Sequence, residues 1–224
     1  MRRCAGFMKS SGYALGMYSS ALRDVAQDVE LGRRITHALG GLPAAFFFFD
    51  VITWDVLGAI LWIGVLIVFL LEYLRLKQGV THVIYRRLTR PYEATSVAAY
   101  AYYAVGMGLA WVLYPPSVAL VGMAALAFGD PISGSLSSPN DPTHRRILSA
   151  VGIATVTFTT TLVVLTGHSQ LATMALACVA GAVAVVSDMY AFTVRGTMVD
   201  DNLLLPLLPS GVLAVVLALI SFLP

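Results

Sequence analysis

Apolar residues occur in long runs along the chain, separated by shorter polar and charged segments. Seven runs stand out, near residues 35–49, 56–74, 96–113, 116–129, 147–166, 169–187 and 203–223. A helix needs about 20 apolar residues to cross the roughly 30 Å of hydrocarbon in a bilayer. The pattern therefore predicts an all-α fold, a polytopic transmembrane helical bundle of about seven spans. The short first and fourth runs leave a count of six open.

The composition supports a lipid environment. Of the 224 residues, 58% are hydrophobic and 12% are charged, and the mean hydropathy is +0.80. A soluble domain carries about a quarter charged residues, because its surface faces water. We therefore expect much of the outer surface to face lipid. The net charge of +2 comes without a basic tract, so no nucleic-acid partner is expected.

The cations divide the connecting segments into two groups. All fourteen lysines and arginines precede the first run or follow the second, fourth and sixth, and the same segments hold ten of the twelve carboxylates. Only Asp50 and Asp55 fall on the other side. Because positive charge is retained in the cytoplasm, we expect an integral membrane protein, in the cell membrane if prokaryotic, with a cytoplasmic N-terminus and active face. Residues 1–29 would form a cytoplasmic extension and residues 30–224 the membrane-embedded domain.

The segment Phe128-Gly129-Asp130-Pro131 ends the fourth run. Glycine permits a sharp turn and proline prevents a helix from continuing, so we expect the helix to stop here with the Asp130 carboxylate at the membrane interface. Ser133 follows in a small, donor-rich loop that can approach phosphate oxygens. The alternative is a helix stop followed by an ordinary polar loop.

Asp200, Asp201 and Asn202 stand directly before the last apolar run. Such oxygen ligands suit Mg²⁺, which prefers one or two carboxylates together with substrate phosphates. Alternatively, Asp201 or Asn202 is simply the N-cap of the final helix. Asp188, near the end of the sixth run, adds a carboxylate on the same side.

Glu30, Arg33, Arg34 and His37 lie at offsets of three and four residues, so they share one face of a predicted helix. Arginine suits phosphate because its planar fork donates two hydrogen bonds at once. The simpler interpretation is a surface ion pair beside a structural histidine. Carboxylates for a metal and arginines for phosphate, on one side of the membrane, meet the requirements of phosphoryl transfer.

These motifs resemble those of the CTP-dependent lipid-alcohol kinases, the family of dolichol kinase, phytol kinase and CTP-dependent diacylglycerol kinase, which is related to phosphatidate cytidylyltransferase. The matching elements, in the family's order over about residues 30 to 210, are Glu30-x-x-Arg33-Arg34-x-x-His37, Glu72-x-x-Arg75, Tyr102-Tyr103-x-x-Gly106, Gly129-Asp130-Pro131, Asp188 and Asp200-Asp201-Asn202-x-x-x-Pro206. The last element is the most specific.

The resemblance implies a kinase that moves the γ-phosphate of CTP, with Mg²⁺ as cofactor, onto a membrane isoprenoid alcohol of the dolichol, polyprenol or phytol type, or a related lipid alcohol. The residues that it assigns to catalysis are Asp130, Asp188 and His37. Those assigned to the metal are Asp130, Asp201 and Asn202. Nucleotide and phosphate contacts would come from Arg33, Arg34, Gly129, Ser133, Arg146 and Ser149.

One element departs from the family's pattern of lysine-serine-x-glutamate-glycine. This chain has Leu148 at the lysine position and Val151 at the glutamate position. The family's serine and glycine are retained as Ser149 and Gly152. Arg145 or Arg146 would then supply the missing cation.

Two alternatives to the kinase stay open at this stage. One is transfer of a cytidylyl group to form a CDP-lipid, although the long lysine- and histidine-rich signature of the classical cytidylyltransferases is absent. The other is a transporter or a catalytically degenerate membrane binding protein. Transporters often carry internal repeats and charges at mid-span, whereas this chain has no clear repeat and places its charges at span ends.

Overall fold

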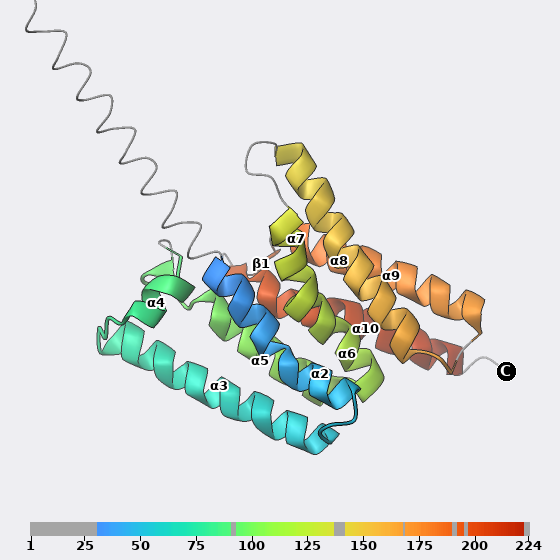
Figure 1. Ribbon diagram of the computed structural model, residues 1–224, viewed down its shortest axis with the longest axis horizontal. Coiled ribbons are helices and arrows are strands. Elements are labelled where there is room, and N and C mark those ends of the chain that lie inside the picture. Colours follow the sequence, from blue (N-terminus) through green and yellow to red (C-terminus); the bar gives the residue numbers. More distant parts are fainter. Residues whose placement is uncertain are drawn as a thin grey trace, which may run out of the picture.

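The computed structural model describes residues 31–90, 93–136, 142–167, 169–189, 192–194 and 197–221 (Figure 1). The predicted N-terminal extension, residues 1–29, and the predicted site residue Glu30 lie outside these ranges. The helices and strands are α2 (Leu42–Phe48), α3 (Trp54–Lys77), α4 (Val83–Leu88), α5 (Ala99–Leu113), α6 (Pro116–Ala124), the π-helix η2 (Ala125–Gly129), α7 (Asp130–Leu136), α8 (Pro142–Val164), α9 (Gln170–Met189), β1 (Phe192–Val194), β2 (Thr197–Val199) and α10 (Asp201–Ser221). Residues 31–40 form a further helix directly before α2.

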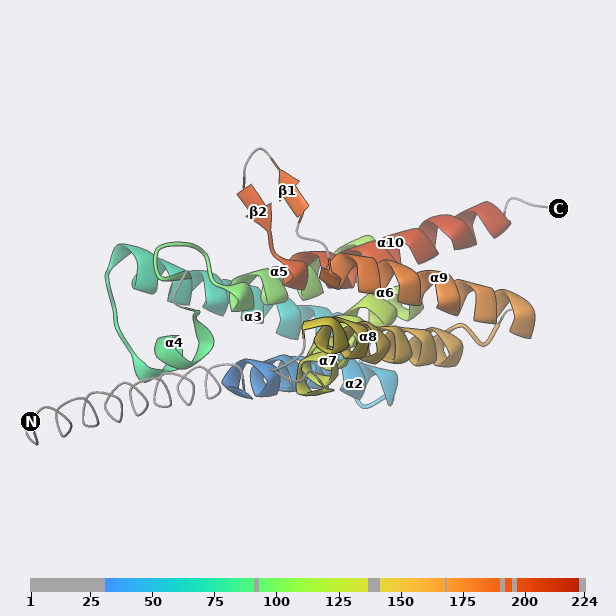
Figure 2. The same cartoon turned by 90° about the horizontal axis from the view of Figure 1, so that it is seen from above.

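The structure is a membrane helical bundle. Within the described ranges, five helical segments are long and apolar enough to cross a bilayer: Trp54–Lys77, Pro116–Ser133, Arg146–Val164, Gln170–Met189 and Asp201–Ser221. The helix Ala99–Leu113 is apolar but shorter. Each apolar run of the sequence is helical, as predicted. The sequence did not predict the two short strands, which pair in antiparallel fashion and project from the bundle as a hairpin (Figure 2).

The helices divide into a central group and a peripheral one. In the segment Pro116–Ser133, 61% of the residues are buried, whereas in the most apolar 18-residue stretch of α3 the share is 22%. The central segment contacts α8 and α10, and α10 also packs against α5 and α9. On α3, large apolar side chains such as Leu66 and Phe69 are exposed. A helix with this much apolar exposure faces lipid.

Two glycines let α10 approach its neighbours closely. A Cβ atom at Gly122 would lie 2.0 Å from the carbonyl oxygen of Pro206, and one at Gly106 would lie 2.7 Å from the carbonyl oxygen of Asn202. Only hydrogen fits at such positions. The Ser210 hydroxyl also donates a hydrogen bond of 3.0 Å to the carbonyl of Val118. This seam between α5, α6 and α10 fixes where α10 begins.

The fourth apolar run does not stop where the sequence predicted. Instead of ending at Gly129, the helix widens into the π-helix η2 and continues as α7, so Ser133 is helical rather than part of a loop. Pro131 lies in the first turn of α7, and because it has no N–H it cannot donate to a carbonyl in the preceding π-helix. Single π-turns inside helices often mark functional positions. Here the π-turn directly precedes Asp130.

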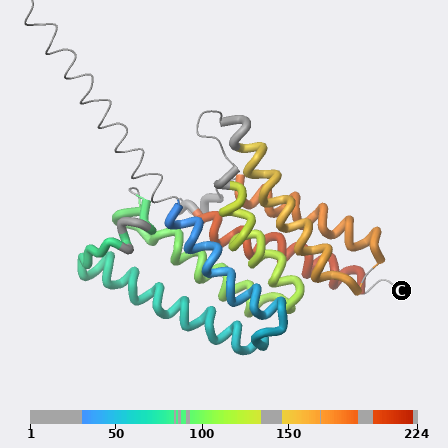
Figure 3. The backbone as a smooth tube through the Cα atoms, viewed as in Figure 1, coloured from blue at the N-terminus to red at the C-terminus, as the bar shows by residue number. Residues whose placement is uncertain are grey.

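Charged groups gather at one end of the bundle, here called the charged end. It comprises the start of the helix 31–40, the end of α3 with α4, α7, the start of α8, the end of α9 and the start of α10 (Figure 3). The described cations all belong to these segments or, in the case of Arg90, directly follow α4: Arg33, Arg34, Arg75, Lys77, Arg86, Arg87, Arg90, Arg145 and Arg146. Asp50 and Asp55 lie at the opposite end, around the turn between α2 and α3.

Candidate functional site at the charged end

Asp130 brings together residues that are far apart in the sequence. Its carboxylate lies 2.9 Å from Nδ1 of His37 and 3.9 Å from the Arg33 guanidinium. The helix 31–40 supplies both partners, four residues apart and therefore on one helical face. The convergence of Arg33, His37 and Asp130 agrees with the sequence prediction that these residues share a site.

His37 is held firmly behind Asp130. Its side chain is buried, with the residue 1% exposed. The Tyr103 hydroxyl donates a hydrogen bond of 2.9 Å to the backbone carbonyl of His37, and the two rings are in tilted contact with centroids 4.7 Å apart. Tyr103 belongs to the tyrosine-glycine element of the sequence. That element therefore orients the histidine, and Gly106, one turn further on, receives α10.

A second carboxylate stands at the end of α9. The Ser149 hydroxyl, from the beginning of α8, donates a hydrogen bond of 3.1 Å to Asp188. Gly152 lies one turn after Ser149, and a Cβ atom there would come within 3.1 Å of the Ser133 backbone. Ser149 and Gly152, the two residues that match the pattern noted in the sequence, therefore both make defined contacts. Val151, between them in the chain, is exposed.

The acids before α10 form a compact turn. The Asp200 carboxylate accepts a hydrogen bond of 3.0 Å from the backbone N–H of Asn202, and the Asn202 side-chain amide donates to Asp200 and, at 3.2 Å, to Asp201. Asp200 is therefore the N-cap of α10, which corrects the prediction that Asp201 or Asn202 takes this role. Asn202 is buried, whereas Asp201 is partly exposed in the first turn of α10.

The three groups of acids face one another across the charged end. Asp130, Asp188 and Asp201 lie close enough for each carboxylate to act electrostatically on the others. Among the described residues, no three histidine, cysteine, aspartate or glutamate side chains converge on one point as a ready-made metal site. A metal ion bound here would therefore need further oxygen ligands from its substrate, as Mg²⁺ takes from phosphates.

The predicted phosphate-binding residues differ in their surroundings. Arg33 is buried beside Asp130, Arg34 is partly buried one residue further along the helix, and Arg146 is exposed at the start of α8. Ser133 is buried, and its hydroxyl donates to the backbone carbonyl of Asp130 at 2.8 Å, which stabilises the first turn of α7. Gly129 is buried against α8. Of these predicted phosphate-binding residues, Arg33 is the one that the structure brings to the Asp130 carboxylate, at 3.9 Å.

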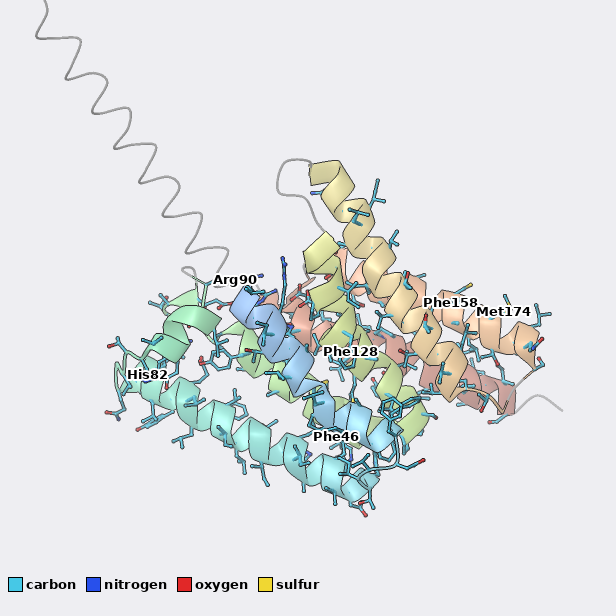
Figure 4. The ribbon with its side chains drawn as sticks, in the orientation of Figure 1. Phe46, His82, Arg90, Phe128, Phe158 and Met174 are labelled. Atoms are coloured by element: carbon cyan, nitrogen blue, oxygen red, sulfur yellow. The ribbon has the colours of Figure 1, made fainter. Side chains whose placement is uncertain are left out.

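Arg90 was missed by the sequence analysis. It lies in the segment after α4, at the charged end (Figure 4), and its charge acts on Asp130. Glu93 fixes this segment, because its carboxylate accepts hydrogen bonds from the backbone N–H groups of Arg90 at 2.8 Å and Ala99 at 3.3 Å. No motif marks Arg90 in the sequence. The short spacing of arginine and glutamate is the one local signal.

Glu72 and Arg75 form a buried ion pair near the site. The guanidinium binds the carboxylate through two hydrogen bonds, of 2.7 and 3.0 Å. Arg75 also donates to the backbone carbonyls of Glu93, Ala94 and Ser96. The pair therefore clamps the segment that carries Arg90 onto the end of α3.

The comparisons with protein-family models, with curated proteins and with solved structures give no match. The resemblance to the lipid-alcohol kinases thus stays a prediction from the motifs.

Proposed function

We propose that this protein is a CTP-dependent kinase that phosphorylates a membrane lipid alcohol. The observation that carries the proposal is the meeting of Asp130, Arg33 and His37, with Asp188 and Asp201 within electrostatic range, at one end of a lipid-facing bundle. A site for this reaction needs carboxylates, phosphate-binding cations and access to the bilayer. The charged end combines all three.

In the proposed reaction, the hydroxyl oxygen of the lipid attacks the γ-phosphorus of CTP. A new O–P bond forms, the bond between the γ-phosphorus and the β–γ bridging oxygen breaks, and CDP leaves. Asp130 accepts the hydroxyl proton, and His37 holds the Asp130 carboxylate in position through its Nδ1 contact of 2.9 Å. Arg33, Arg34 and Arg146 bind the phosphate oxygens, whose charge spreads in the transition state.

Asp188 and Asp201 are the residues best suited to hold Mg²⁺, because the Asp130 carboxylate is already engaged by His37 and Arg33. When bound, the ion neutralises charge on the β- and γ-phosphates. Asn202 positions Asp201 through its side-chain amide. The proposed metal ligands are thus Asp188 and Asp201, in place of the set Asp130, Asp201 and Asn202 that the sequence predicted.

We also propose seven spans with a cytoplasmic N-terminus, so that the charged end faces the compartment that contains CTP. Five crossings come from the long helices. The other two are α5 and the helical segment 31–48, whose 18 residues span about 27 Å at 1.5 Å per residue. The test introduces single cysteines into a cysteine-free variant of the protein in intact cells. In this orientation Thr81→Cys is protected from a maleimide that cannot cross the membrane, whereas Asp50→Cys reacts with it. The opposite labelling would overturn this orientation.

The test of the kinase uses purified protein in lipid nanodiscs with Mg²⁺ and CTP labelled at the γ-phosphate. Polyprenol, phytol and diacylglycerol are offered separately, and lipids are extracted and separated. The expected result is a labelled lipid phosphate from at least one alcohol, lost in Asp130→Asn and retained in the control Asp50→Asn, whose acid lies at the opposite end.

Two results would reject the kinase. If no alcohol is labelled while CTP still binds in a manner that Asp201→Ala abolishes, the protein is a binding protein. If the product carries cytidine, as a CDP-lipid, the protein transfers a cytidylyl group instead.

A further inference from the structure

A cavity opens between the helical segment 31–43, α3, α4 and α5. Its volume is about 360 Å³, within the range of roughly 300–1,000 Å³ found for ligand sites. Apolar side chains such as Leu61, Val68 and Met107 form most of its wall. His37 lines the cavity as well, and this residue contacts Asp130 on its other side. The cavity therefore leads from the apolar region of the bundle to the proposed catalytic group.

The polar atoms in the wall are bound to the protein, with one exception. The hydroxyls of Tyr85 and Tyr103 donate to the backbone carbonyls of Leu71, at 3.3 Å, and His37, at 2.9 Å, and the Tyr100 hydroxyl donates to Glu72. Nε2 of His37 is buried and has no hydrogen-bond partner among the described residues. A buried polar atom left in this state is unfavourable.

The two nitrogens of an imidazole ring point in different directions. Because Nδ1 of His37 faces Asp130, Nε2 is directed away from it. Nε2 is covered in this conformation, so a ligand hydroxyl reaches it after a small shift of the ring against Tyr103. Hydrogen bonds of this kind commonly become well aligned only when the substrate binds. A hydroxyl bound there lies next to the His37–Asp130 pair.

We propose that this cavity binds the hydroxyl end of a single-chain lipid alcohol, with the hydroxyl on Nε2 of His37. The inference rests on the proposed kinase and names its acceptor. Walls from four segments and a volume near the lower end of ligand sites suit one chain rather than the two acyl chains of diacylglycerol. The rest of the chain extends into the bilayer.

A second apolar cavity lies on the other side of α2, between α2, α6, η2 and α8, and also has a volume of about 360 Å³. Its polar lining residues Thr159 and Thr160 donate to carbonyls of their own helix, at 2.7 and 2.8 Å. This cavity lacks a counterpart of His37 in its lining. We therefore assign the alcohol to the first cavity.

Gly64 offers a clean way to fill the first cavity. It lines the cavity from α3, and a Cβ atom there would meet no other atom within 4 Å. A larger side chain at this position occupies the ligand's space without displacing the protein, and glycine is an unfavourable residue inside a helix. Gly40, in contrast, is unsuitable, because its Cβ would lie 2.8 Å from the Tyr103 ring.

The experiment uses the full chain in nanodiscs and a photoactivatable diazirine analogue of geranylgeraniol, without CTP. Labelled peptides are mapped by mass spectrometry. We expect labelling on α3 and α5, lowered about tenfold in Gly64→Phe, since losing apolar contacts in a pocket typically costs 10-fold or more. The controls Ala59→Phe, on the exposed face of α3, and Val163→Trp, in the second cavity, keep wild-type labelling.

Unfolding temperatures of all variants establish that they are folded, and Gly64→Leu replaces Gly64→Phe if the larger side chain prevents folding. Undiminished labelling of the Gly64 variant, or labelling on α8, would overturn the proposal. Competition by diacylglycerol equal to that by unlabelled geranylgeraniol would overturn the single-chain assignment. The labelling needs no nucleotide, so it tests the cavity separately from the kinase. Specific labelling without phosphate transfer would reject the kinase but support the cavity as a lipid site. Phosphate transfer without specific labelling would support the kinase but reject the cavity as its lipid site.

Discussion

The charged end contains two acid–arginine groups with opposite characters. Arg75 uses all five of its N–H donors, two on Glu72 and three on backbone carbonyls. Glu72 in turn accepts from Arg75, from the Tyr100 hydroxyl and from the backbone N–H of Ala98. A pair saturated in this way has no capacity left for a ligand.

The group around Asp130 is built more sparsely. Within the described part of the chain, its carboxylate has one hydrogen-bond partner, His37, and the Arg33 guanidinium stands at 3.9 Å, beyond hydrogen-bond distance. Both groups occur in the sequence motifs, and only their contacts distinguish them. The comparison teaches that an acid and an arginine in a motif can serve different purposes. Glu72–Arg75 fixes a neighbouring segment of the chain, whereas Asp130 lies at the centre of the proposed site.

The largest expected effect is a loss of protein stability when the saturated Glu72–Arg75 pair is broken. Glu72→Ala leaves the Arg75 charge buried without its partner, which typically costs about 3–5 kcal/mol of unfolding free energy. Denaturant unfolding in detergent measures this loss. The double variant Glu72→Leu/Arg75→Met should recover much of it, because neither charge is then buried. Unchanged stability of Glu72→Ala, with loss of CTP binding, would instead place Glu72 in the site.

Asp130→Asn is expected to lower activity strongly while changing stability little. It retains the shape of the side chain but removes its charge, so lipid phosphorylation should fall about 100- to 1,000-fold, as for other groups that act in the transition state. The unfolding free energy should change by no more than about 1 kcal/mol, as is usual away from saturated networks. Steady-state kinetics and denaturant unfolding together test this. A variant that retains more than about a tenth of the wild-type rate would refute the role given to Asp130.

His37 should give an intermediate effect, because it acts on Asp130 from behind. Residues that orient a catalytic group typically contribute about 10- to 100-fold to activity. His37→Asn keeps a donor near the Nδ1 position but removes Nε2, so the KM for the alcohol should rise more than kcat falls. His37→Gln, which reaches the Nε2 position, should show the reverse. Equal effects of the two substitutions on both constants would indicate a purely structural histidine.

Arg90 should show the smallest effect. Arg90 is partly exposed and its charge acts on Asp130, so Arg90→Gln is expected to raise the KM for CTP about two- to fivefold, the range of partly exposed charge interactions. Lys77→Gln removes the same charge from an exposed position at the charged end and serves as the matched control. Equal changes in both variants would reduce the role of Arg90 to general electrostatic attraction.

The helices were predictable because a bilayer imposes long apolar runs on the sequence. The sequence also predicted that the candidate site residues gather at one end of the bundle. In a chain that crosses the membrane repeatedly, every second connecting segment lies on the same side, and the charged segments alternate in this way. His37 and Asp130, which are 93 positions apart, could therefore be expected near each other. Their direct contact could not, because it depends on how the helix 31–40 is rotated against α7.

Local sequence rules did not predict the structure correctly where the same residue type is favourable in two different structures. Pro131 is compatible both with the end of one helix and with the first turn of the next, and the π-turn before it decides for the second. Asp200, Asp201 and Asn202 are all good N-caps, so the composition could not show that Asp200 takes that position. Gly106 and Gly122 gave no sign of their function, because their partner Pro206 lies some 80 to 100 residues further along the chain.

The seam between Gly106, Gly122 and Pro206 has a consequence for biosynthesis. The central helices α5 and α6 leave the ribosome well before α10, yet they carry the glycines against which α10 packs. Until α10 is inserted, the acids at its start are missing from the charged end, and the glycine faces of α5 and α6 stand open to lipid or to other helices. The proposed site therefore becomes complete only after α10 has been inserted, even though Arg33, His37 and Asp130 are made long before it.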